Sequence, residues 1–146
     1  YFDVDTELTL EDIAVDDVDL TTIVGNIIDN AFDAVSMNRE EEKKIVSFGI
    51  FEEDGKCCIS VSNNGPVISD IHKNHIFDYK YSTKDKMKGE RGYGLFIVKE
   101  LVTQNKGEIM VESTEQETEF RMQFRYKTKA AQANVDKVAS MQKVNI

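Results

Sequence analysis

The sequence has few of the residues that cross-link or interrupt a chain. Among its 146 residues there is no tryptophan, one proline, and two cysteines, Cys57 and Cys58. Adjacent residues of a strand point to opposite faces, so this pair indicates reduced thiols rather than a disulfide or a zinc framework. No apolar run approaches the roughly 18 residues that a membrane-spanning helix needs. These absences exclude a disulfide-rich scaffold and a transmembrane helix.

Basic residues are almost absent from the first part of the chain. Residues 1–42 hold thirteen acidic residues and only Arg39 as a base, whereas residues 43–146 hold seventeen basic and fourteen acidic residues. The acidic start is the opposite of a signal or transit peptide, so we expect a cytoplasmic location. The net charge of -9 disfavours nucleic-acid binding by the whole surface. A local anion site in the second part of the chain stays open.

Length and composition predict one soluble domain. A chain of 146 residues that is 40% hydrophobic and 31% charged is typical of a single globular unit. We expect the domain to occupy residues 1–126. Residues 127–146 contain no aromatic residue and only weak helical spacing, so we expect them to form a separate C-terminal tail.

Hydrophobic spacing predicts both strands and helices. Apolar residues alternate in several short segments, and Asp54-Gly55 between two of them is a hairpin turn signal. Strands are expected at residues 2–8, 46–50, 57–61, 109–111 and 120–126, and helices at residues 18–37, 69–77 and 93–105. This pattern predicts an α/β two-layer sandwich in which helices cover one face of the sheet.

A polar stripe follows the longest predicted helix. At 100° per residue, one arc of residues 20–35 is apolar, and the opposite side gathers Thr22, Asn26, Asp29, Asn30 and Asp33. A merely solvated stripe would favour Glu and Lys, whereas Asn lowers helix propensity and carries no charge. Oxygens of Asn and Asp at this spacing could hold a hydrated Mg²⁺ together with substrate phosphates. A solvated helix face is the alternative.

The segment at residues 89–102 is a candidate phosphate site. Gly89, Gly92 and Gly94 precede an apolar helix, and glycines let backbone N–H groups approach a ligand closely. No Ser, Thr, Asp or Asn cap stands immediately before Leu95, so a bound phosphate could take that place. The preceding loop is basic, with Lys80, Lys84, Lys86, Lys88 and Arg91. A flexible turn before a helix is the alternative.

Four segments, in order, resemble the motifs of the GHKL ATPase superfamily. NIIDNAFDA at residues 26–34 is similar to the N box, SNNGPVI at 62–68 to the G1 box, IFDYKYSTK at 76–84 to the F box, and GERGYGLFIVKELV at 89–102 to the G2 box. The chain most resembles the catalytic ATP-binding domain of sensor histidine kinases, in particular citrate, dicarboxylate and peptide-pheromone sensors. The resemblance implies a Bergerat-type fold, a mixed sheet covered on one face by about three helices.

The resemblance also implies roles for individual residues. Asn30 matches the family's magnesium-binding asparagine, and Asn26 lies one turn earlier, near the phosphates and the metal. Both are the expected catalytic residues. The residues expected to bind the nucleotide are Asn26, Asn30, Asp33, Asn63, Gly65, Lys84, Gly89, Arg91, Gly92, Gly94 and Leu95.

The G1-like segment departs from the family pattern. The family's D-x-G-x-G falls on residues 63–67, so Asn63 replaces the adenine-reading aspartate and Val67 the second glycine, while Gly65 is retained. An amide oxygen can still accept a hydrogen bond from the adenine amino group, but more weakly than a carboxylate. The alternative function is therefore a degenerate module that binds nucleotide poorly and acts as a protein-interaction scaffold.

The amide side chain of Asn26 indicates which reaction the domain catalyses. Other branches of the superfamily carry a glutamate at this position as general base, and an amide cannot accept that proton. This disfavours an ATPase or serine kinase and favours phosphoryl transfer to a histidine. The only histidines, His72 and His75, lie in a short predicted helix rather than a long hairpin.

The expected role is that of a histidine kinase catalytic domain which is inactive as an isolated fragment. ATP and Mg²⁺ are the expected cofactors. The expected partners are a histidine-bearing dimerisation domain of the same kinase and a response regulator, with no nucleic acid and no direct membrane contact. We expect the chain to be the cytoplasmic domain of a longer membrane-bound sensor.

Overall fold

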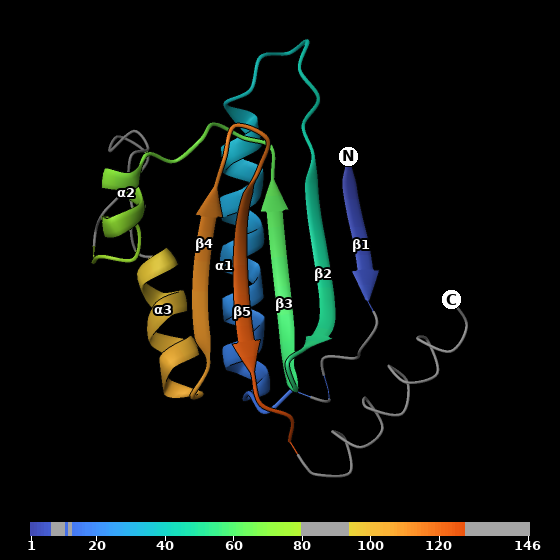
Figure 1. Ribbon diagram of the computed structural model, residues 1–146, viewed down its shortest axis with the longest axis vertical. Helices are drawn as coiled ribbons and strands as arrows, with labels where there is room; N and C mark the ends of the chain where they lie inside the picture. The colour runs from blue at the N-terminus through green and yellow to red at the C-terminus, as the bar shows by residue number, and fades with distance from the viewer. Residues whose placement is uncertain (7–10, 12, 80–93, 128–146) are drawn as a thin grey trace.

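The fold is a mixed five-stranded sheet with helices on one face. The computed structural model describes residues 1–6, 11, 13–79 and 94–127 (Figure 1). The elements, in chain order, are β1 (Phe2–Thr6), α1 (Asp17–Ser36), β2 (Val46–Glu53), β3 (Lys56–Asn63), α2 (Asp70–His75), α3 (Gly94–Gln104), β4 (Glu108–Ser113) and β5 (Thr118–Phe124). The predicted α/β two-layer sandwich with a mixed sheet is confirmed.

The sheet order is β1-β2-β3-β5-β4. Only β1 and β2 are parallel, and α1 lies between them in the chain, while the β2–β3, β3–β5 and β4–β5 pairs are antiparallel. The β2–β3 turn occurs at Asp54 and Gly55, whose φ angles are 53° and 74°. Two residues with positive φ match the twist of a two-residue hairpin, so this predicted hairpin is confirmed.

Helix α1 begins where the sequence provides a cap. The Asp16 side chain accepts hydrogen bonds from the backbone N–H groups of Val18 and Asp19, which would otherwise lack partners. The end of α3 is tied to the same place, because Asn105 Nδ2 donates to Asp19 Oδ2 at 2.9 Å and Asn105 Oδ1 accepts from the Asp16 N–H at 3.3 Å. These bonds hold α1 and α3 side by side.

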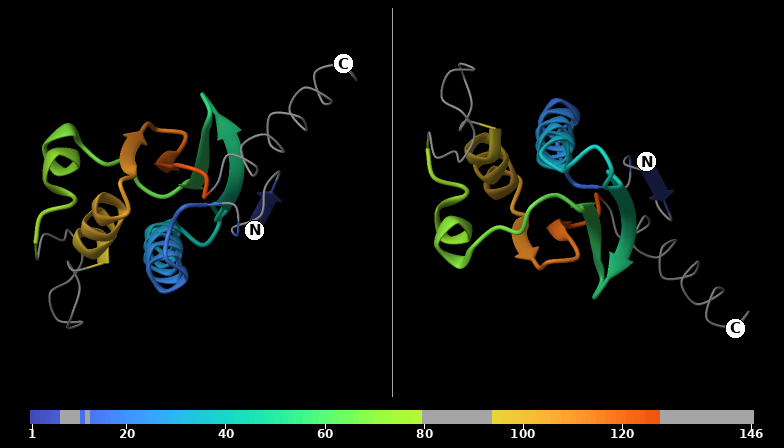
Figure 2. Two further views of the ribbon diagram at one scale, coloured as in Figure 1. Left: turned by 90° about the horizontal axis from the view of Figure 1, so that it is seen from below. Right: turned by 90° about the horizontal axis from the view of Figure 1, so that it is seen from above.

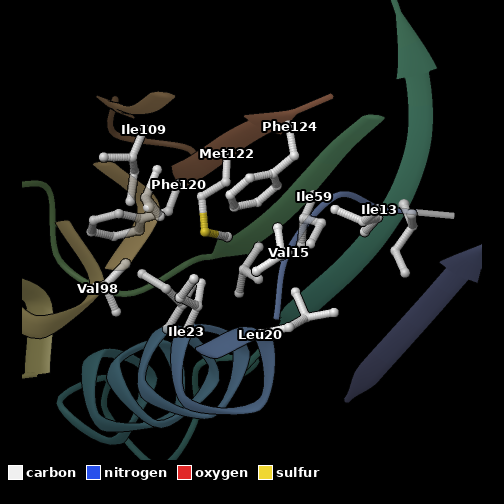
Figure 3. Close-up of a cluster of buried hydrophobic side chains, with 14 of the residues drawn as sticks. Ile13, Val15, Leu20, Ile23, Ile59, Val98, Ile109, Phe120, Met122 and Phe124 are labelled. Carbon is white, nitrogen blue, oxygen red and sulfur yellow. The ribbon is translucent and has the colours of Figure 1, made fainter. Parts of the chain in front are cut away.

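The core lies between the sheet and the helices α1 and α3 (Figure 2). Buried side chains recur at helical spacing in α1 and at every second position in β5, as the two periodicities require. Figure 3 shows Ile23, Val98 and Phe120 meeting in this layer. One member of the predicted apolar arc differs: Phe32 is 45% exposed, and its ring packs against that of Phe2 with centroids 5.6 Å apart. It lies toward the β1 edge, outside the main core.

The cysteines and α2 complete the described fold. Cys57 and Cys58 are buried on β3, and burial is the main cause of the raised pKa of the Cys58 thiol. Helix α2 is shorter than the predicted segment and lies beyond the β4 edge, near α3 (Figure 1). No helix within the described ranges is long and apolar enough to cross a membrane.

Candidate functional site

One end of the polar stripe on α1 meets the start of α3. The Asn26 side chain is partly buried, and its Nδ2 donates to the carbonyl oxygen of Thr22 at 2.8 Å. A Cβ atom built on Gly94 would lie 3.0 Å from Asn26 Oδ1. The first residue of α3 therefore stands against the amide oxygen of Asn26. Because the N-terminus of a helix carries a partial positive charge and unpaired N–H groups, this contact brings anion-binding groups to the stripe.

The loop after β3 meets α1 two turns farther along. A Cβ atom built on Gly65 would lie 2.8 Å from both the carbonyl carbon and the carbonyl oxygen of Ala34. Asn26 and Ala34 are about 12 Å apart along the helix axis, at 1.5 Å per residue. Asn30 and Asp33 belong to the helix surface between these two contacts. The stripe is therefore bounded at one end by α3 and at the other by the Gly65 loop.

The Gly65 contact leads to a stability prediction. We expect Gly65→Ala to lower the free energy of unfolding by about 1–3 kcal/mol, because the added methyl group overlaps rigid backbone. The matched control is Gly25→Ala, where a Cβ atom would meet nothing within 4 Å and the helix should gain up to about 1 kcal/mol. Thermal unfolding of both variants measures the difference. Equal stability of Gly65→Ala and the parent chain would contradict this contact.

Two buried polar residues face each other near the Gly65 loop. Asn63 on β3 is 3% exposed and Thr118 on β5 is 2% exposed, and no other polar residue is buried in the described part of the chain. They are register partners at one end of the sheet. Their side chains lie on the same face of the sheet as those of Val61 and Phe120, which is the face covered by the helices. An apolar core does not need such a pair, so it marks a candidate recognition site.

Each member of this pair has a defined polar neighbour. Asn63 Oδ1 accepts a hydrogen bond from the Gly65 N–H at 2.9 Å. Thr118 Oγ1 lies 2.6 Å from Ser113 Oγ, which accepts from the Ile68 N–H at 2.9 Å. The hydroxyl groups and the loop backbone therefore form one connected network at this end of the sheet.

Thr118 was not among the residues expected from the sequence. The signal is its position, since it takes the place of an apolar residue in the alternation that continues through Phe120, Met122 and Phe124. A threonine in the buried phase of a strand is a polar group that needs a partner. Its pairing with Asn63, 55 residues earlier, follows only from the β3–β5 register.

The structure describes seven of the expected nucleotide-binding residues. Asn26, Asn30 and Asp33 share the α1 stripe, and Gly94 and Leu95 begin α3. Asn63 is the last residue of β3, and Gly65 lies in the loop after it. The remaining four, Lys84, Gly89, Arg91 and Gly92, fall in residues 80–93, outside the described residues.

The donor atoms of the stripe suit one kind of metal. Within the described residues there is no group of three or more His, Cys, Asp or Glu side chains that could hold a metal ion. The stripe instead offers amide and carboxylate oxygens from Asn26, Asn30 and Asp33. Mg²⁺ accepts a few such oxygens when waters and phosphates fill its other positions, so the donor set fits a magnesium–phosphate complex rather than zinc.

An open pocket of about 360 Å³ lies beyond Gly65. It is lined by the end of α1 and the loop after β3, including Met37, Arg39, Pro66 and Val67. None of the stripe residues Asn26, Asn30 and Asp33 lines it, so it is distinct from the candidate site on α1.

The sequence profile described as "Histidine kinase-, DNA gyrase B-, and HSP90-like ATPase" matches residues 15–128, well over half of the chain. The chain is 33% identical over 101 residues to the sensor histidine kinase DpiB of Escherichia coli (strain K12), which is 69% of this chain and 18% of that protein. It is 32% identical over 119 residues to a probable C4-dicarboxylate sensor kinase of Bacillus subtilis (strain 168), which is 81% of this chain and 22% of that protein. The chain thus spans about a fifth of the length of these relatives.

Solved structures share the fold. The catalytic domain of histidine kinase ThkA, in a nucleotide-free form, superposes with a TM-score of 0.70 at 24% identity, covering 85% of this chain and 77% of that one. Full-length ShkA in complex with AMPPNP gives a TM-score of 0.65 at 21% identity, covering 87% of this chain and 26% of that one. The fold, the order of the motifs and the profile match agree, and the chain belongs to the histidine kinase-, DNA gyrase B- and HSP90-like ATPase family as a histidine kinase-type ATP-binding domain.

Proposed function

We propose that the chain binds Mg²⁺-ATP and donates the γ-phosphoryl group to a histidine on a dimerisation domain outside these residues, in two-component signal transduction. The observation that carries this proposal is the contact between Asn26 and the start of α3 on a stripe that also holds Asn30. Amide oxygens beside a helix N-terminus suit a metal-bound triphosphate.

We assign a proposed role to each residue of the candidate site. Asn30 binds Mg²⁺, with Asn26 and Asp33 beside it on the stripe. The backbone N–H groups of Gly94 and Leu95 donate hydrogen bonds to phosphate oxygens. Asn63, Gly65 and Thr118 contact the base. Lys84, Gly89, Arg91 and Gly92 are proposed to close around the phosphates, as the family resemblance implies.

The acceptor of the phosphoryl group is proposed to be a histidine outside the chain. Asn26 is an amide and cannot remove a proton from water or a hydroxyl group, whereas an imidazole is nucleophilic without such help. What this domain supplies is the position of the phosphates and the neutralisation of their charge. The relatives named as sensor kinases support a response regulator as a further partner.

The setting of the domain is part of the proposal. The relatives are about five times longer than the match, which supports a cytoplasmic catalytic domain, residues 1–126, within a longer membrane-bound sensor. ShkA was solved with AMPPNP, which supports an adenine nucleotide in this fold.

Calorimetric titration of the whole chain with ATP, with and without Mg²⁺, tests the function. We expect binding that is strongly weakened when EDTA removes the metal, because the donor set on α1 requires a cation to hold the phosphates. If the chain binds no nucleoside triphosphate in either condition, the catalytic proposal is wrong. A protein-interaction scaffold would then be the better account.

A further inference from the structure

The orientation of the Asn63 amide is determined by its own loop. Its Oδ1 accepts from the Gly65 N–H at 2.9 Å, and an NH₂ group in that place would face a second donor. Gly65 cannot retreat, because the space on its Cβ side is filled by the Ala34 backbone. The oxygen therefore stays on the Gly65 side, and the amide nitrogen takes the other position.

The amide nitrogen remains available to a ligand. Asn63 is almost completely buried, and among the described residues no hydrogen-bond partner is found for Nδ2. Nδ2 is not among the described side-chain atoms that are sealed from solvent without a partner, so an acceptor on a ligand can reach it and pair with it. On the neighbouring strand, Thr118 offers a hydroxyl group, which can donate or accept.

We propose that Asn63 reads the base with a donor instead of an acceptor, so that the site admits 6-oxopurine nucleotides, those of hypoxanthine and guanine, at least as readily as adenine nucleotides. This inference rests on the proposed nucleotide-binding function and concerns the substrate class of the same site. A carboxylate at residue 63 would keep one oxygen for Gly65 and present the other as an acceptor. That acceptor selects the 6-amino group of adenine and repels the 6-oxo group.

A donor makes the opposite selection, because it pairs with a 6-oxo group and faces a like donor in a 6-amino group. The Asn63 Nδ2 can donate to the O6 atom of hypoxanthine or guanine, whereas adenine has no acceptor at its 6-position and offers only ring nitrogens. The hydroxyl of Thr118 adapts to either base, because it rotates between donor and acceptor roles. The polar network therefore gives adenine no advantage over a 6-oxopurine.

Competition between ATP and ITP tests this inference, because the two nucleotides differ at the purine 6-position and carry the same triphosphate. With the whole chain and Mg²⁺, we expect ITP to bind at least as tightly as ATP, to within about threefold. The variant Asn63→Asp replaces only Nδ2 by oxygen. In this variant we expect ATP to bind at least about tenfold more tightly than ITP, because the carboxylate and the 6-oxo group of ITP are both acceptors. Calorimetry measures both constants, and GTP serves as a third ligand.

The matched control is Thr118→Val, which removes the adaptable hydroxyl but no selective group. It should weaken ATP and ITP alike and leave their ratio unchanged. A parent chain that binds ATP more than threefold tighter than ITP would overturn the inference, and so would an ATP-to-ITP ratio that Asn63→Asp does not change. Either result leaves the proposed function intact, which fails only if no purine triphosphate binds.

Discussion

Asn30→Ala is expected to weaken Mg²⁺-ATP binding by at least about tenfold, since it removes a proposed metal ligand. Asn30 is half-buried on α1 between the Asn26–Gly94 and Ala34–Gly65 contacts, and it flanks the buried arc of Leu20, Ile23 and Ile27 without belonging to it. The variant should therefore fold normally. Calorimetric titration in Mg²⁺ and in EDTA measures the effect, which should vanish in EDTA.

The control for this prediction is Asn105→Ala, which changes a second asparagine whose role is structural. Asn105 joins the end of α3 to the start of α1 through Asp16 and Asp19. Its loss should reduce the free energy of unfolding by about 1–3 kcal/mol and leave nucleotide affinity nearly unchanged. If Asn30→Ala binds Mg²⁺-ATP as tightly as the parent chain, the metal assignment is wrong.

The isolated chain is expected to hydrolyse almost no ATP, yet to phosphorylate a histidine when the cognate dimerisation hairpin is added in trans. Asn26 provides no base to activate water, and its amide nitrogen is already bonded to Thr22. Adding an imidazole supplies the missing nucleophile to the nucleotide that the domain is proposed to hold in position. Phosphate release and radiolabel transfer measure the two reactions, with the hairpin in excess because no covalent link concentrates it.

The location of the label is the control for this experiment. His75 Nδ1 lies 2.8 Å from Asp78 Oδ2 at the end of α2, and His72 belongs to the same six-residue helix. Neither has the setting of an acceptor on a long hairpin, so the label should appear on the added hairpin and persist with His72→Ala and His75→Ala. Rapid hydrolysis by the chain alone, lost in Asn26→Ala, would favour an ATPase instead.

The sequence was sufficient to predict most elements of the fold. The 3.6-residue spacing in residues 18–37 and the alternation from Phe120 to Tyr126 depend only on near neighbours in the chain, and they correspond to α1 and β5. The Asp54-Gly55 turn is similarly local, because its two residues adopt the positive φ angles of a tight hairpin. The stripe that contains Asn26 and Asn30 follows from the same helical geometry.

The partners of these residues depended on contacts between distant parts of the chain. Phe32 belongs to the apolar arc by spacing, but its exposure was decided by the position of β1 beside β2 at the sheet edge. Likewise, no local pattern places Gly65 against Ala34 or Thr118 beside Asn63.

Local periodicity determined which elements form and which face of each is polar, because backbone geometry repeats over a few residues. Only the tertiary structure decided which polar faces meet, because strand register and helix packing join segments that are far apart in the chain. The candidate magnesium stripe could therefore be found in the sequence alone. The buried pair of Asn63 and Thr118, and the direction of the Asn63 amide, required the folded chain.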